Sequence, residues 1–362
     1  MKLIVDLPDV TFSRLEKLLR DGHWQSLNQA IVAAIETHLT LTEGQGPASE
    51  PLDALQVTAK SIGSAATAKR SEARQALRLE LIESPAAAPM PPVEEVSSRR
   101  YHLFGISRLA PVKVGARALA ILLAGADSMK LSDFKERGAA VVRELGDALL
   151  TADQEAGRSR GERLCAGFPR SGSNGEETRG SEQRYAFFVL GDMQKKKPVA
   201  DGALYRLRLA AIEPLGNGEA NIRITGPGLE LARMPNPLLD GADGELATAF
   251  SEKEAEWYLR HVLENVPDER ETIRRFLRYI ESGAARPADM FAAMATDYAD
   301  LSENARANAR ACVIGRLVDL GLATRSEKGG LLFTPRGRDI EALVAQGPRR
   351  DGPAEGSHVG LP

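Results

Sequence analysis

Basic and amide side chains at two places in the chain have the chemistry to bind a charged polymer. A lysine run, 195–197, precedes two arginines, and a later helical stretch repeats asparagine and arginine. Lysine and arginine bind phosphate oxygens, and asparagine and arginine also hydrogen-bond to base edges. The pattern predicts DNA contacts, with a solvated helix face or a protein-binding face as alternatives. The predicted contact residues here are Lys195, Lys196, Lys197, Arg206, Arg208, Asn304, Arg306, Asn308, Arg310, Lys328 and Arg336.

The sequence contains no recognisable catalytic set. The glycine-rich segment 167–175 lacks the lysine of a phosphate-binding loop, and the five histidines are scattered without metal-ligand spacing. Cys165 and Cys312 do not form a Cys-x-x-Cys pair. We therefore expect a protein that is not an enzyme and that holds neither metal nor cofactor.

Composition limits how nucleic acid could be bound. The 362 residues carry a formal net charge of −3, so any DNA contact must come from local basic patches. The two cysteines suit a reducing compartment, and the longest apolar run is about half the length of a bilayer span. With no signal-peptide pattern at the N-terminus, we expect a cytoplasmic protein without a membrane partner.

The first forty residues predict a strand followed by two helices. Residues 2–7 alternate with period two, and the stretches 12–19 and 26–39 each carry one apolar stripe. Forty residues bury too little surface to fold alone, so pairing with a second copy is expected. This order and length resemble the ribbon-helix-helix family of Arc, MetJ and CopG type.

That resemblance implies a homodimer through residues 1–42 with its ribbon in the DNA major groove. The second helix would point its N-terminus at a phosphate, which implies contacts from Lys2, Ser26 and Asn28. The outer strand face departs from the family, because Ile4 offers no hydrogen bond and Asp6 repels phosphate. A clip that dimerises without reading bases is the alternative.

Two later segments look alike. Residues 202–228 and 313–337 each predict a helix, a strand, a glycine turn, a returning strand and a Thr-x-x-Gly entry into a last helix. Thr225 and Thr334 stand where a helix cap is needed. Both segments, the second more strongly, resemble the winged-helix family, which implies tandem winged-helix domains.

The predicted fold class is mainly α with small β: a ribbon-helix-helix, a linker, then tandem winged-helix-like domains. A short helix around 72–81 fits within the linker, ahead of its extended Pro-rich part, 84–92. The predicted organisation is a dimerisation and DNA-binding module, 1–42; a Pro/Ala-rich linker, 43–100; a winged-helix-like α/β domain, 101–240, with a long polar insert, 156–184; a C-terminal winged-helix domain, 251–345; and a disordered tail, 346–362.

Two functions fit these features. The first is a dimeric protein that binds double-stranded DNA, either a transcriptional regulator or an accessory factor in DNA maintenance. The second is a non-catalytic adaptor subunit of a larger bacterial assembly, such as one for phage defence or chromosome handling, which uses its winged helices to contact protein.

Overall fold

The computed structural model describes 71–77, 85–96, 103–159, 161–193, 200–216, 218–241, 249–326 and 329–345. These residues belong to one compact unit, 69–362. They are mainly helical with small sheets, which confirms the coarse fold class. The predicted ribbon-helix-helix module, 1–42, and the predicted tail, 346–362, lie outside the described residues.

The N-terminal half of the described chain combines helices with a three-stranded sheet in the order β1-β5-β4. Both pairings are antiparallel, and Ile222 at the centre of β5 is opposite Met129 and Ile212. Its elements are α4 (Val93–Val96), α5 (Ala110–Leu122), β1 (Met129–Lys130), α6 (Leu131–Glu155), α7 (Gly175–Tyr185), the π-helix η1 (Ala186–Leu190), β2 (Asp192–Met193), β3 (Ala200–Asp201), α8 (Ala203–Arg206), β4 (Ala210–Gly216), β5 (Glu219–Ile224), α9 (Gly226–Arg233) and α10 (Pro237–Asp240).

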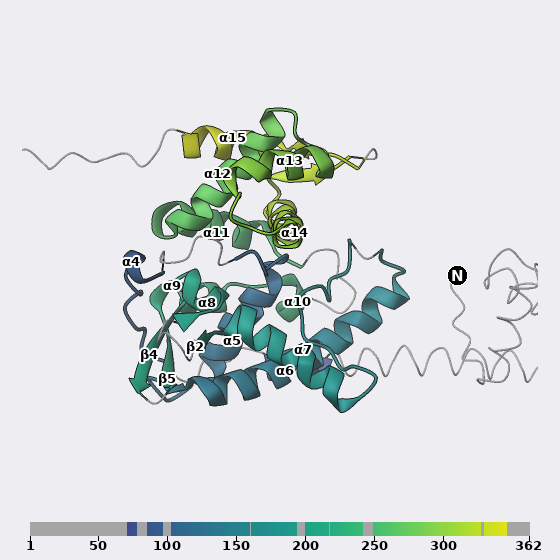
Figure 1. Cartoon of the computed structure of the whole chain (residues 1–362). Coiled ribbons are helices and arrows are strands. Elements are labelled where there is room, and N and C mark those ends of the chain that lie inside the picture. The colour runs from purple at the N-terminus through teal and green to yellow at the C-terminus, as the bar shows by residue number, and fades with distance from the viewer. Residues whose placement is uncertain are drawn as a thin grey trace, which may run out of the picture. The chain divides into compact units, whose positions relative to one another are not determined.

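The C-terminal half contains five helices and one antiparallel hairpin among the described residues. In Figure 1, α14 is seen end-on between α12, α13 and α15 above it and the N-terminal half below it. Its elements are α11 (Glu252–Asn265), α12 (Pro267–Glu281), α13 (Pro287–Asp297), α14 (Glu303–Asp319), β6 (Ala323–Arg325), β7 (Leu331–Phe333) and α15 (Pro335–Ala345).

The predicted repeat is confirmed at the level of local structure. Each copy is a helix, an antiparallel hairpin and a second helix: α8-β4-β5-α9, the first helix–hairpin unit, and α14-β6-β7-α15, the second. The Thr225 hydroxyl accepts from the Gly228 amide at 3.2 Å, and that of Thr334 accepts from the Gly337 amide at 3.0 Å. Both threonines therefore cap their helices as predicted.

The same backbone contact recurs behind each cap. A Cβ atom at Gly228 would overlap the Leu209 carbonyl oxygen, and one at Gly337 would overlap the Leu322 carbonyl oxygen. Each glycine thus lets the last helix lie directly against the strand that opens its hairpin. The first copy differs in one respect: its leading helix, α8, spans only Ala203–Arg206, and Ala210 already begins β4.

The segments predicted as an extended Pro-rich linker and a long polar insert are both built into the fold. The Pro-rich stretch is extended as predicted, but the Ala88 amide donates to the Ile224 carbonyl at the end of β5. The second part of the polar insert is α7, because the Asn174 side chain caps the Glu177 amide and starts a helix. Of the helix expected around 72–81, the structure shows a helix at 71–76, while 78–81 lie outside the described residues.

Buried cations from α5 hold the end of α9. Lys113 Nζ donates to the carbonyls of Leu231 and Met234, and the Arg117 guanidinium donates to those of Ala232 and Met234. Lys113 Nζ also lies 3.4 Å from the Glu254 carboxylate on α11. Burial lowers the pKa of Lys113 to about 8, although Glu254 opposes the shift.

Arg316 on α14 connects the two halves. Its guanidinium pairs with both carboxylate oxygens of Glu269 on α12, at 2.9 and 3.1 Å. It also donates to the carbonyls of Leu103 and Ile106, which precede α5. Burial disfavours the charged arginine, but Glu269 outweighs it, so the net pKa of Arg316 is raised. The residue therefore stays charged where water is excluded.

Replacing Arg316 with Met should destabilise the protein strongly. The substitution leaves the Glu269 carboxylate buried and unpaired, which costs about 3–5 kcal/mol. Urea unfolding measures the loss. Arg274→Met is the matched control, because Arg274 pairs with Glu271 on the surface and should cost under about 1 kcal/mol. Equal losses in the two variants would contradict the role of Arg316.

The repeated glycine contact gives a second prediction. Gly228→Ala and Gly337→Ala should each cost about 1–3 kcal/mol, because the new methyl group must displace backbone. Gly226→Ala is the control, since a Cβ atom there meets nothing within 4 Å. Its expected change is small and favourable, up to about 1 kcal/mol. Thermal unfolding of the three variants measures whether the two glycines in contact with backbone lose stability while the control glycine does not.

Candidate nucleic-acid interface

Two of the predicted contact residues come together on one aromatic ring. Arg306 and Arg310 lie one turn apart on α14, and their guanidinium carbons are 5.2 and 5.7 Å from the centre of the Phe291 ring on α13. Arg310 Nη1 donates to the Pro287 carbonyl at 2.7 Å. Within the described part of the chain, neither arginine makes an ion pair with a carboxylate.

Further cations lie near this pair. Arg286 precedes α13 directly, and its side chain is 74% exposed and pairs with Asp289 at 2.7 Å. The hairpin turn passes beside it, because a Cβ atom at Gly330 would lie 3.9 Å from Arg286 Cγ. Arg325 at the end of β6 is exposed, and it is opposite Leu331, whose amide donates to the Ala285 carbonyl next to Arg286. We call Arg286, Arg306, Arg310 and Arg325 the α13–α14 basic cluster.

Part of the other side of α14 packs on the N-terminal half. The Asn308 side chain donates to the Phe104 carbonyl at 3.2 Å, and Gly315 packs against the Ser107 carbonyl. Farther along, Asp319 accepts from the Leu109 amide at 3.0 Å, at the start of α5. Asn308 thus makes a contact between the two halves, but it is exposed, as Asn304 is, so DNA contact by these two residues stays a prediction.

Arg336 lies apart from the basic cluster. It lines a groove between α11 and α15 together with Glu252, Glu256, Glu264 and Asp339. These carboxylates make the surroundings of Arg336 acidic, which is unfavourable for a phosphate. The prediction that Arg336 contacts DNA is therefore unsupported by its position.

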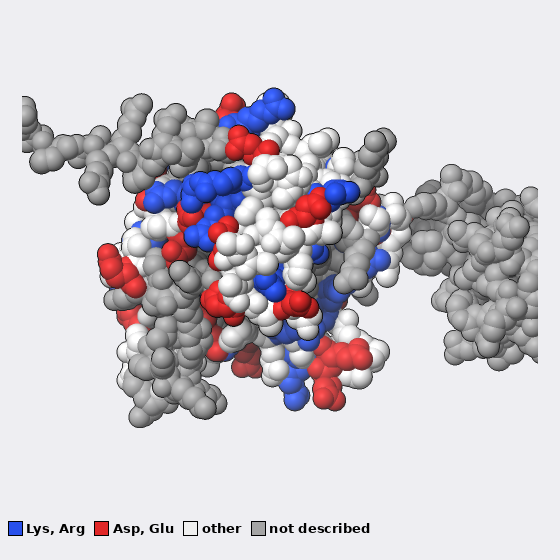
Figure 2. All heavy atoms as spheres, turned by 45° about the horizontal axis from the view of Figure 1, so that its top comes forward, with Lys and Arg blue, Asp and Glu red and all other residues white. Residues whose placement is uncertain are grey.

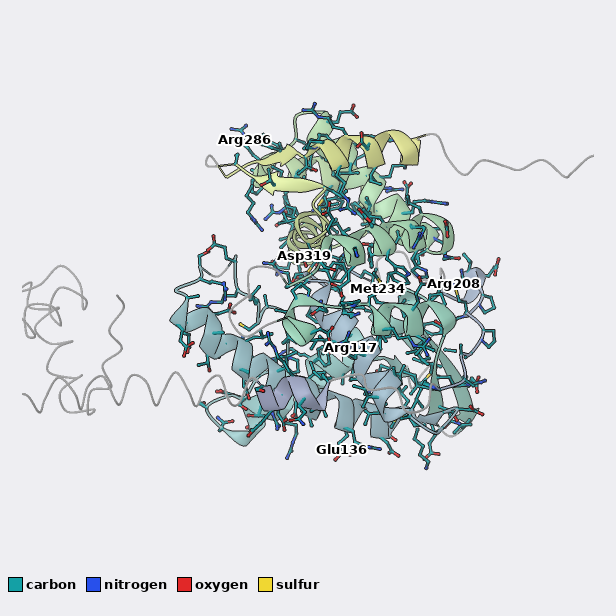
Figure 3. The ribbon with its side chains drawn as sticks, turned by 180° about the vertical axis from the view of Figure 1, so that it is seen from behind. Arg117, Glu136, Arg208, Met234, Arg286 and Asp319 are labelled. Carbon is teal, nitrogen blue, oxygen red and sulfur yellow. The ribbon has the colours of Figure 1, made fainter. Side chains whose placement is uncertain are left out.

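Arg206 and Arg208 both make internal contacts, and burial contradicts the predicted phosphate contact of Arg206. Arg206 is fully buried, and its Nε lies 3.0 Å from the Asp201 carboxylate. Arg208 has a φ of 58°, and its guanidinium donates to the carbonyls of Pro91 at 2.8 Å and Asn265 at 2.9 Å. In Figure 3 Arg208 and Arg286 lie far apart.

Several predicted contact residues lie outside the described residues, and their role stays a prediction. They are Lys2, Ser26, Asn28, Lys195, Lys196, Lys197 and Lys328.

The surface charge of the described residues is mixed. On the face shown in Figure 2, lysine and arginine alternate with aspartate and glutamate, with no continuous positive band. The described residues contain no group of three or more His, Cys, Asp or Glu that could hold a metal ion. None of the described helices has both the length and the apolar character needed to cross a membrane.

A second concave surface lies in the N-terminal half, with a volume of about 980 Å³. It is bounded by α6, α7, η1 and the β4–β5 turn. Most of its charges neutralise one another: Lys135 pairs with Asp192, and Arg143 with Glu182, each at 2.6 Å. It therefore lacks the excess positive charge that a phosphate backbone requires.

Phe291 and Arg286 were not among the residues predicted from sequence. The spacing of Arg306 and Arg310 indicates that they share a helix face, but not which side chain of another helix lies across from it. Phe291 sits in the α13 sequence Pro-Ala-Asp-Met-Phe, where an aromatic residue is equally compatible with the core.

No protein-family model, curated protein or solved structure matches this chain.

The structural role of Arg208 can be tested with two substitutions. Arg208→Ala loses both hydrogen bonds and keeps a Cβ atom in the left-handed region, whereas Arg208→Gly loses the bonds but relieves the backbone. Both should be less stable than wild type in urea unfolding, with the glycine variant the more stable of the two by roughly 1 kcal/mol. The reverse order would contradict this explanation.

Proposed function

We propose that the chain is a DNA-binding protein that contacts duplex DNA through the C-terminal half, with the exposed end of α14 and the β6–β7 hairpin against the DNA. The observation that carries the proposal is the pair Arg306 and Arg310, two neighbouring cations without a carboxylate partner among the described residues. Like charges at this spacing repel each other in the free protein. An anion between or beside them removes that cost.

The order of the elements supports tandem winged helices as the scaffold. In the C-terminal half, α12, α13 and α14 are followed by β6, β7 and α15. The Leu331 amide at the start of β7 donates to the carbonyl of Ala285, which lies in the segment that connects α12 to α13. In the N-terminal half, β1 occupies the corresponding place beside β5. In winged-helix proteins of the helix-turn-helix type, the second helix of the motif enters the major groove, and the proposal assigns this role to α14.

The charge balance indicates what kind of binding to expect. One small basic cluster on a protein of net charge −3 should give modest, salt-sensitive affinity dominated by phosphates. A dimer formed through residues 1–42 would raise the effective concentration of a second copy on the same DNA. A transcriptional regulator or an accessory factor in DNA maintenance fits such a bivalent protein.

An adaptor that binds another protein is the second candidate. It is favoured by the mixed charge of the surface in Figure 2. It is also favoured by the concave surface of about 980 Å³ beside α6 and α7, because its paired charges suit a protein partner better than a phosphate backbone. This function uses the N-terminal half, whereas DNA binding uses the C-terminal half.

Replacing both Arg306 and Arg310 with Ala should weaken binding to duplex DNA by the same factor whatever the sequence of the duplex. Each lost phosphate contact should reduce the magnitude of the slope of log affinity against log salt concentration by about 1. The slope of the double variant should therefore be smaller in magnitude by about 2. Fluorescence anisotropy over a salt series measures both quantities on the full chain.

The control variant is Lys253→Ala with Arg260→Ala, which removes two exposed cations from α11, near the acidic groove. It should retain nearly all of the affinity and slope. If wild type binds no duplex at low salt, or if the control loses as much affinity as the Arg306 and Arg310 variant, DNA binding through α14 is wrong.

A further inference from the structure

We propose that Phe291 is a positioning residue that holds Arg306 and Arg310 as a two-arginine clamp for the phosphate groups of the DNA backbone. This inference rests on the proposed function and assigns a role to a side chain that itself has no charge. It predicts that the aromatic ring, and not its volume alone, determines affinity.

The geometry of the three side chains carries the inference. One ring on α13 accepts both guanidinium groups, at 5.2 Å for Arg306 and 5.7 Å for Arg310, within the range of a cation–π interaction. The negative face of the ring attracts each cation and offsets their mutual repulsion. Two positive groups are thereby kept close together without a carboxylate that would neutralise them.

The hydrogen bonds leave most of the donors open. An arginine has five N–H donors, and the only hydrogen bond of Arg310 to the described residues is the one from Nη1 to the Pro287 carbonyl. Arg306 Nε is buried and has no hydrogen-bond partner among the described residues, so the Phe291 ring is what restrains this side chain. The remaining N–H groups can meet phosphate oxygens.

The clamp should act by preorganisation. A free arginine on a helix surface samples many rotamers, and binding a phosphate must order it. Stacking on Phe291 orders both arginines before DNA arrives, so less entropy is lost on binding. Phosphate is the fitting ligand because guanidinium groups bind its oxygens in a planar, bidentate manner.

The test compares Phe291→Leu with Phe291→Tyr in the full chain, using anisotropy with a short fluorescent duplex of mixed sequence. Leucine keeps an apolar side chain but removes the ring, so affinity should fall about five- to thirtyfold, because two arginine side chains must then be ordered on binding. Tyrosine keeps the ring face and should bind within about threefold of wild type, well short of the leucine loss.

A double-mutant comparison separates positioning from general damage. In the Arg306→Ala, Arg310→Ala background, Phe291→Leu should change affinity less than about twofold, because no arginine remains to be held. Equal losses in the two backgrounds, or wild-type affinity of Phe291→Leu, would overturn the clamp while leaving DNA binding intact. Wild-type protein that binds no duplex would overturn the proposed function, and the clamp with it.

Discussion

The buried guanidinium of Arg316 is the interaction on which the arrangement of the two halves depends. It joins α12, through Glu269, to the segment before α5, through the carbonyls of Leu103 and Ile106. A buried charge is tolerable only when its hydrogen-bonding groups are satisfied, so this contact has a definite geometry. Figure 3 shows the neighbouring Asp319 in the middle of the molecule, where the same helix meets the start of α5.

This anchoring divides α14 into surfaces with different uses. The side with Asn308 and Gly315 is occupied by the N-terminal half, whereas the side with Arg306 and Arg310 lies against α13 and keeps its charges. Because α14 is fixed at one end by buried contacts, the arginines at its other end have a stable position. Such support favours binding, because little conformational entropy is lost when a ligand binds to side chains that are already ordered.

The two helix–hairpin units share backbone geometry but not chemistry. Thr225 and Thr334 make equivalent caps, and the positive φ that Gly321 supplies in the second unit is adopted by Arg208 in the first. In the first unit Arg206 and Arg208 make internal contacts, whereas in the second Arg306 and Arg310 lie near the surface and Arg316 is buried. Equivalent folds can therefore carry different functions.

Much of the local structure was determined by the sequence itself: the two hairpins, the threonine caps and the apolar stripe of α14 follow from patterns of neighbouring residues. Only the tertiary structure decided which basic residues remain near the surface. Arg206, Arg306 and Arg316 have the same side chain, and their spacing gives no sign that the first and last are buried. Burial and pairing depend on segments distant in sequence, such as Leu103 and Phe291, and no local pattern encodes which of them will meet.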